Sequence, residues 1–271
     1  MNFSINNKTV CAGTGGITFD PSRPTVILIH GAAMDHTVWA LQSRYIAHHG
    51  YSVLALDLPG HGHSEGPVLS TIGEMSNWVE SALAAVGISE AVLVGHSMGA
   101  NIALETAANN PSRIHKLVLA GAASPMQVNE KLLLQTRDDP LVAVEKITSW
   151  AYGHRAHIGG TQTPGLWMLA GGRRLLQRNI EQELHNDFSA CNNYTQGIES
   201  ASKIKCPTLI IAGDDDRMTP ARRAYSLQKA ITNSRVEIIK DSGHMMMIEC
   251  PDTTLALLFS FINSPDPPNQ K

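Results

Sequence analysis

Short runs of consecutive apolar residues recur along the chain and predict buried β-strands. The six clearest runs are TVILI (25–29), SVLAL (52–56), AVLV (91–94), KLVLA (116–120), TLIIA (208–212) and VEIIK (236–240). Continuous apolar runs, rather than alternating apolar and polar residues, are typical of strands that helices cover on both faces. The pattern therefore predicts a mostly parallel central sheet.

Segments with helical spacing lie between these runs. We expect connecting helices over 73–86, 100–109, 221–230 and 252–262. The start of the chain, with Gly13, Gly15 and Gly16 as a turn, is typical of an antiparallel hairpin at the sheet edge. Strands that alternate with helices predict an α/β fold.

One connection is much longer than the others. Between Ala120 and Thr208 no further core strand is evident, and the segment over 124–203 has a helical pattern instead. Because structureless loops of this length are rare in compact domains, we expect an inserted helical cap over the strand ends. The predicted core domain is then made of 1–123 and 204–271.

Composition narrows the class of protein. The chain has 271 residues, of which 43% are hydrophobic and 17% charged, as in a soluble globular domain. A net charge of −3 without a long basic run gives no indication of nucleic-acid binding. The first residues do not form a signal peptide, and no apolar stretch is long enough to cross a membrane. The oligomeric state is left open.

The cysteines are few and far apart. They are Cys11, Cys191, Cys206 and Cys250, without a CxxC pair. This spacing favours reduced thiols over a disulfide framework or a zinc site. We therefore expect a cytoplasmic protein that has no nucleic-acid or membrane partner.

Polar residues that could take part in catalysis or binding follow the predicted strands. Functional residues of an open parallel sheet gather outside the carboxyl ends of its strands. The stretches found there are HGAAMD (30–35), DLPGHGHS (57–64), GHSMG (95–99), GDDDRMTP (213–220) and DSGHMMMIECP (241–251). A serine, a cluster of aspartates and a histidine thus reach one edge of the sheet in that order.

Ser97 lies between Gly95 and Gly99, where a strand stops and a helical pattern starts. Such a turn either exposes the hydroxyl for chemistry or is a plain glycine–serine turn. Because serine is a poor nucleophile without a base, a histidine should lie nearby. His244 is the candidate, since it follows the last strand and precedes a helix.

The remaining histidines have simpler interpretations. We expect His30 to be structural and His96 to be hidden in the turn beside Ser97. His61 and His63 could bind a metal together with Glu65, but their spacing matches no strong metal motif, so loop packing is favoured.

The five stretches together resemble the α/β-hydrolase family, in which a strand–GxSxG–helix unit carries the nucleophilic serine. The resemblance spans nearly the whole chain and is greatest to capped bacterial esterases, lactonases and C–C hydrolases. It implies Ser97 as nucleophile and His244 as base. It also implies an oxyanion hole formed by the backbone N–H groups of Ala32 and Met98, and no metal or organic cofactor.

Three adjacent aspartates compete to be the third catalytic residue. In the family the acid stands three residues after the strand-ending glycine and four before a proline. Gly213 and Pro220 then select Asp216 over Asp214 and Asp215. The alternative for all three is a solvated acidic turn.

The resemblance also narrows the reaction. Ser97 replaces the aspartate nucleophile of haloalkane dehalogenases and epoxide hydrolases, which makes those activities unexpected. HGAA departs from the glycine-rich HGxGPG loop of many C–C hydrolases. We predict hydrolysis of a small or medium, apolar carboxylic ester through an acyl-enzyme. The alternatives are an enol-lactonase, a C–C hydrolase, a perhydrolase-like activity, or a receptor-like protein that binds small molecules with little turnover.

Flexible apolar side chains are concentrated after the strands and in the predicted cap. The candidate pocket residues are Met34, Met126, Trp167, Met168, Met218 and Met245. Methionine suits an adaptable apolar pocket, but it also fills gaps in partly buried regions, and both interpretations stand. Arg173 and Arg174 could meet a substrate carboxylate or lie on a solvated helix face.

Overall fold

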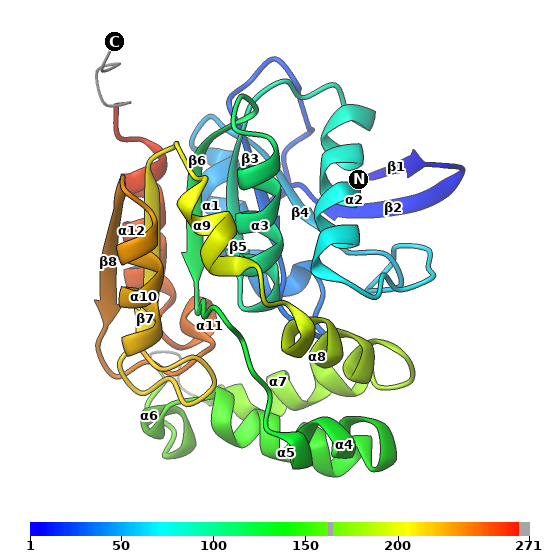
Figure 1. The fold of residues 1–271 in the computed structure, drawn as a ribbon, viewed down its shortest axis with the longest axis vertical. Helices are drawn as coiled ribbons and strands as arrows, with labels where there is room; N and C mark the ends of the chain where they lie inside the picture. The colour runs from blue at the N-terminus through cyan, green and yellow to red at the C-terminus, as the bar shows by residue number, and fades with distance from the viewer. Residues whose placement is uncertain (162–164, 266–271) are drawn as a thin grey trace.

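A computed structural model describes residues 1–161 and 165–265 (Figure 1). Eight strands form one sheet in the order β1-β2-β4-β3-β5-β6-β7-β8. The strands are β1 (Asn2–Ile5), β2 (Lys8–Gly13), β3 (Thr25–Ile29), β4 (Ser52–Leu56), β5 (Ala91–His96), β6 (Ile114–Ala120), β7 (Thr208–Gly213) and β8 (Ser234–Ile239). All neighbours from β4 to β8 pair in parallel, which confirms the predicted α/β class.

Burial differs between the centre and the edge of the sheet. Every residue of β3, β4, β5 and β7 is buried, as their continuous apolar runs predict. The edge strand β8 is instead largely half-buried or exposed, and Arg235 and Glu237 are among its residues. We had expected helices to cover the run VEIIK on both faces. It forms an edge strand instead.

Helices cover both faces of the sheet. On one face α2 (Ile72–Ala85), α3 (Met98–Asn109), α9 (Gly197–Ser202) and α10 (Arg222–Ala230) pack in succession (Figure 1). On the other face lie η1 (His36–Trp39), α1 (Ala40–His48), α11 (Met246–Glu249) and α12 (Pro251–Ile262). These layers leave the carboxyl ends of the parallel strands as the place where loops can build a site.

The N-terminal hairpin is present, but its turn is not where we predicted it. Strands β1 and β2 pair antiparallel and project from the sheet edge (Figure 1). Their turn is Asn6–Asn7, with φ of 51° and 62°, whereas Gly13 ends β2. Two successive left-handed residues match the twist of a tight hairpin, and asparagine tolerates that conformation well.

A helical segment lies between β6 and β7, within residues 124–203. It contains α4 (Glu130–Asp138), α5 (Pro140–Ala151), α6 (His154–His157), α7 (Met168–Gln177), α8 (Glu183–Asn193) and α9. Helices α4 to α8 gather at one end of the molecule, beyond the end of β6 (Figure 1). Residues 162–164 of the predicted cap and 266–271 of the predicted core lie outside the described residues. Among the described helices, none is both long and apolar enough to cross a membrane.

Candidate active site

Ser97 occupies a sharp turn between β5 and α3. Its φ of 55° and ψ of −117° are rare for a residue with a side chain and are typical of strained functional positions. The Ser97 N–H donates to the carbonyl of Ala120 on β6 at 2.9 Å. Ser97 is half-buried and lines a cavity, so the strained turn places it where a small molecule could reach it.

Gly95 and Gly99 make this turn sterically possible. A Cβ atom at Gly95 would lie 2.1 Å from the Gly99 carbonyl oxygen, and one at Gly99 would lie 2.4 Å from the His30 carbonyl oxygen. Backbone at such distances leaves no room for a side chain. The two glycines therefore let α3 start directly against β5 and β3.

The loop after β3 lies beside Ser97. Strands β3 and β5 are neighbours at the point where the strand order reverses, which is where open α/β sheets bind ligands. A Cβ atom at Gly31 would lie 3.3 Å from Ser97 Cβ, and Ala32 and Ser97 line the same cavity. Within the described residues, the N–H groups of Ala32 and Met98 donate to no protein acceptor. Both are thus available to a substrate oxygen.

A buried acid–base pair lies close by. His244 Nδ1 is 2.8 Å from Asp216 Oδ2. Asp216 Oδ1 accepts the N–H groups of Met218 and Thr219, each at 2.8 Å, and Thr219 Oγ1 donates to Asp216 Oδ2 at 2.7 Å. With Nδ1–H donating to the carboxylate, Nε2 is the ring nitrogen left to exchange a proton with substrate.

The environment keeps Asp216 ionised. Burial opposes the charged form, but the charge and hydrogen bond of His244, together with the bonds from Thr219, outweigh it and lower the pKa of Asp216. Asp214 is exposed and accepts the Ser242 N–H at 3.4 Å, while Asp215 accepts the His154 N–H. Of the three aspartates, the structure brings Asp216 to His244.

The loop after β8 crosses back toward β5 and places His244 beside His96, the residue before Ser97. His96 Nε2 donates to the His244 carbonyl at 2.9 Å, and the two rings lie 4.7 Å apart. Gly121, at the end of β6 with φ of 57°, allows this passage, because a Cβ there would lie 3.0 Å from His244 Cε1. No hydrogen bond joins Ser97 Oγ and His244 within the described residues. Such bonds often tighten only in the substrate complex.

Three residues that hold the Asp216–His244 pair in place were not identified in that role from the sequence. Thr219 orients Asp216, Gly121 makes room for His244, and His96 anchors the His244 backbone. Burial, and then the nearby His244, lower the pKa of His96 to about 3, so it is a neutral donor. The small-residue run GAAS after β6 was a usable signal for Gly121, whereas nothing in the sequence marked the other two roles.

The cavity at Ser97 has a volume of about 210 Å³ and a mostly apolar lining. Met126 and Met218, which were predicted for the pocket, line it. The other members include Val128, Leu132, Trp150, Phe188 and Cys191. Most of this wall comes from the helical segment and not from the sheet edge.

The remaining predicted pocket residues lie elsewhere. Trp167, Met168 and Met245 line a second cavity of about 460 Å³ to which Ser97 does not contribute. Met34 is buried and lines neither cavity. Arg174 also lines the second cavity, and Arg173 pairs with Glu145 at 2.7 Å. The predicted pocket is therefore divided between two places.

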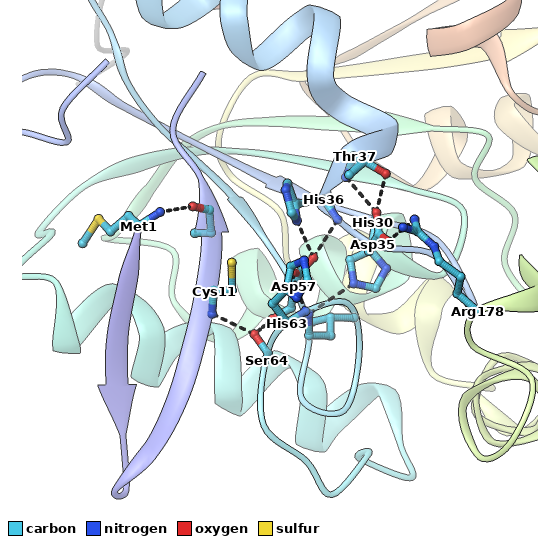
Figure 2. A network of polar contacts seen from close by, with 12 residues as sticks. Met1, Cys11, His30, Asp35, His36, Thr37, Asp57, His63, Ser64 and Arg178 are labelled. Atoms are coloured by element: carbon cyan, nitrogen blue, oxygen red, sulfur yellow. Dashed lines mark hydrogen bonds and ion pairs between the residues drawn. The ribbon is translucent and has the colours of Figure 1, made fainter. Parts of the chain in front are cut away.

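Cys11, His36 and Asp57 form a separate polar network with ligand atoms within 4.8 Å of one another (Figure 2). The buried Asp57 carboxylate already accepts the His36 N–H and Nδ1–H, each at 2.8 Å, and the His63 N–H at 3.0 Å. Burial and then Asp57 raise the pKa of the Cys11 thiol, which favours a neutral sulfur. Hydrogen bonds therefore satisfy this carboxylate, and we assign the network a structural role.

The possible His61–His63–Glu65 metal group is not assembled. His61 Nε2 lies 2.8 Å from Asp187 on α8, and Glu65 accepts the Thr9 N–H instead. His61 thus connects the loop after β4 to the helical segment.

Comparison with known proteins agrees with this architecture. A protein of Klebsiella pneumoniae subsp. pneumoniae named "Putative carbamate hydrolase RutD" is 28% identical over 260 residues, which cover 88% of this chain and 91% of that protein. A solved thermophilic esterase is 28% identical, with a TM-score of 0.81 over 97% of this chain and 96% of that one. An enol-lactonase from Burkholderia xenovorans has a TM-score of 0.85 over 97% and 100% of the two chains, but at 21% identity it shows the fold alone.

A family pattern also matches the chain. The pattern described as "Alpha/beta hydrolase family" matches residues 26–257, which is most of the chain and includes both the Ser97 turn and the His244 loop. This span, the sheet order and the turn at Ser97 agree with one another. The chain belongs to the alpha/beta hydrolase family.

Proposed function

We propose that the protein hydrolyses small or medium carboxylic esters with an apolar acyl portion through an acyl-enzyme at Ser97. The observation that carries the proposal is the strained Ser97 turn, which lines a cavity together with Ala32. The Ala32 and Met98 N–H groups have no protein acceptor among the described residues, and the buried Asp216–His244 pair adjoins His96, the neighbour of Ser97 in the chain. In this mechanism Ser97 Oγ attacks the ester carbonyl carbon while His244 Nε2 takes its proton. The Ala32 and Met98 N–H groups stabilise the oxyanion.

The second half of the reaction regenerates the enzyme. His244 gives its proton to the leaving alcohol, and a water molecule then loses a proton to His244 as it attacks the acyl carbon. Asp216 holds the imidazole tautomer and stabilises its protonated form throughout. Side chains and backbone supply every group that this route needs, so we propose a reaction without metal or organic cofactor.

The cavity supports a compact, apolar substrate. Its volume of about 210 Å³ is below the range of about 300–1,000 Å³ that drug-sized ligands occupy. Leu132 on α4, Trp150 on α5 and Phe188 on α8 supply apolar wall. We therefore propose that residues 124–203 act as a cap that selects substrates, over a core formed by 1–123 and 204–271.

A carbamate is the second candidate substrate. It is favoured by the similarity to proteins named as carbamate hydrolases, and its carbonyl carbon is open to the same attack by Ser97. Enol-lactones and C–C bonds are further alternatives, and a receptor-like protein would bind such molecules without turnover. Because all four cysteines are free thiols, we keep the cytoplasm as the proposed location.

Steady-state hydrolysis tests the proposal. Wild type and Ser97→Ala would be compared on p-nitrophenyl acetate, butyrate and octanoate, a p-nitrophenyl carbamate, an enol-lactone and a ring-fission dienone. We expect wild type to turn over the shorter esters fastest and Ser97→Ala to fold normally without turnover. Equal ester turnover by the two proteins would refute the role of Ser97, and a faster carbamate or lactone reaction would replace the proposed substrate.

A further inference from the structure

Helix α8 contributes a fully buried carboxylate to the loop that carries the Ala32 N–H. Asp187 Oδ2 accepts the Ala33 N–H at 2.8 Å and lies 2.8 Å from His61 Nε2. Asp187 and His61 are both buried, although one comes from the helical segment and the other from the loop after β4. A buried charge persists only where such partners satisfy it.

The hydrogen-bond partners of His61 favour a charged pair. His61 Nδ1 lies 3.1 Å from the Pro59 carbonyl oxygen, and Nε2 faces the Asp187 carboxylate, so both ring nitrogens face acceptors. An imidazole that donates from both nitrogens carries a positive charge. Burial alone would lower the pKa of His61, but the charge and hydrogen bond of Asp187 outweigh it and raise the pKa.

Ala33 needs support from outside its own loop. Its φ of 54° is in the left-handed region, which is unfavourable for alanine unless the surroundings impose it. The Ala33 carbonyl accepts from Asn179 Nδ2 at 3.1 Å, so side chains of the helical segment bond both its N–H and its C=O. Asp35 follows two residues after Ala33, and its carboxylate accepts a hydrogen bond from Arg178 at 2.6 Å (Figure 2). The segment therefore fixes the conformation of the peptide next to Ala32.

We propose that Asp187 and His61 form a clamp by which the helical segment positions the oxyanion loop. The clamp holds Ala33 left-handed and so directs the neighbouring Ala32 N–H toward the Ser97 cavity. Asp187 is a positioning residue, since it bonds the loop and is not itself one of the residues that line the Ser97 cavity. Its effect on turnover rests on the function proposed above, whereas its effect on the loop does not.

The clamp can be removed without leaving a buried charge unpaired. In His61→Phe/Asp187→Leu, apolar side chains replace both partners, an exchange that is often neutral for stability. Asp187→Asn is the conservative variant, because its side-chain oxygen can still accept the Ala33 N–H. Tyr194→Phe is the matched control, since it breaks another contact between segment and core, the 2.6 Å bond to Glu105 on α3, far from the oxyanion loop.

Two measurements on each folded variant test the clamp. The first is kcat and KM on p-nitrophenyl acetate. We expect the double variant to lose at least about tenfold in kcat, as for a weakened oxyanion donor, with KM within about threefold. Asp187→Asn and Tyr194→Phe should both stay within about threefold of wild type in kcat.

The second measurement is amide hydrogen exchange of a peptide that spans residues 30–36, which needs no turnover. We expect faster exchange in the double variant only. A folded double variant with wild-type kcat, or with unchanged exchange in this peptide, would overturn the clamp. Absence of turnover in wild type would count against the proposed function alone, and the exchange result would then decide the clamp.

Discussion

The sheet edge and the helical segment over 124–203 both build the Ser97 cavity, but they contribute in different ways. Ser97, Asp216 and His244 each follow a strand, within a turn whose geometry depends on a few neighbouring residues. Leu132, Trp150 and Phe188 reach the cavity from separate helices whose relative placement depends on packing. Under the proposed function, the core supplies the chemistry, whereas the segment supplies substrate choice and loop positioning.

The largest effect is expected for a substitution of the proposed catalytic acid in the core. Asp216→Asn keeps the side-chain shape but removes the charge that stabilises protonated His244. The corresponding change in a serine protease lowers turnover about ten-thousand-fold, so we expect a loss of at least about a hundredfold in kcat on p-nitrophenyl acetate. Asp214→Asn and Asp215→Asn are the controls and should stay within about tenfold, because neither contacts His244. If Asp214→Asn or Asp215→Asn lost activity while Asp216→Asn stayed active, the catalytic acid would be a residue other than Asp216.

Substitutions in the segment should change which ester is preferred. Phe188→Ala enlarges the Ser97 cavity, and each methylene buried there is worth about 0.8 kcal/mol. We expect the octanoate-to-acetate ratio of kcat/KM to rise about tenfold. Met168 lines the second cavity, so Met168→Ala should leave that ratio unchanged. If Met168→Ala shifts the ratio as much as Phe188→Ala, the second cavity belongs to the substrate path.

A smaller effect is expected when the Thr219 hydroxyl no longer donates to Asp216. Thr219→Val removes one hydrogen bond to Asp216 while it keeps the side-chain volume. The bond reaches an ionised carboxylate and so contributes about 1.5 kcal/mol or more. Because the Met218 and Thr219 N–H groups and His244 still hold Asp216, we expect only part of this loss in turnover, with kcat lower by about fivefold and KM unchanged. Thr148→Val is the matched control, since the buried Thr148 hydroxyl has no hydrogen-bond partner among the described residues. Equal losses in both variants would mean that the effect is one of packing.

The smallest effect concerns the dependence of stability on pH. Because the folded-state pKa of His61 is raised, the stability from its protonation is complete below its ordinary pKa of about 6.5 and is lost as pH rises through the raised pKa. Asp187 is its direct partner, Glu183 adds a more distant negative charge, and the His30 ring lies 5.0 Å away.

Burial and then His61 lower the pKa of His30 to about 4, so His30 is neutral across this range and does not mask the effect. The melting temperature of wild type should therefore fall more between pH 6 and pH 9 than that of His61→Phe/Asp187→Leu. A difference of about 2–4 °C corresponds to 1 kcal/mol in a domain of this size. Parallel profiles for the two proteins would mean that His61 is not protonated in the folded state.

The same contrast explains how much could be predicted. The central strands were predictable because burial on both faces requires unbroken apolar runs. Ser97 and His244 were predictable because each stands in a short motif directly after a strand. The candidate catalytic residues of the core are therefore visible in local motifs.

The rest depends on contacts between distant residues. Asp187 lies in the polar stretch ELHNDFSA, which gives no indication of a fully buried carboxylate 154 residues from its partner Ala33. Trp167 and Met168 are as apolar as the true wall residues, and only helix packing assigns them to another cavity. The hairpin turn was misplaced because glycine was favoured over the Asn6–Asn7 pair, which can adopt the same conformation.

The proposed function depends most directly on the transfer of the acyl group to Ser97 during turnover. Intact-mass spectrometry of wild type, quenched in acid within the first turnovers of p-nitrophenyl butyrate, tests it directly. The account predicts a species heavier by one butyryl group, with the added mass in the peptide that contains Ser97, and no such species in Ser97→Ala. Hydrolysis by wild type without any acylated species, or with the acyl group on another residue, would contradict it.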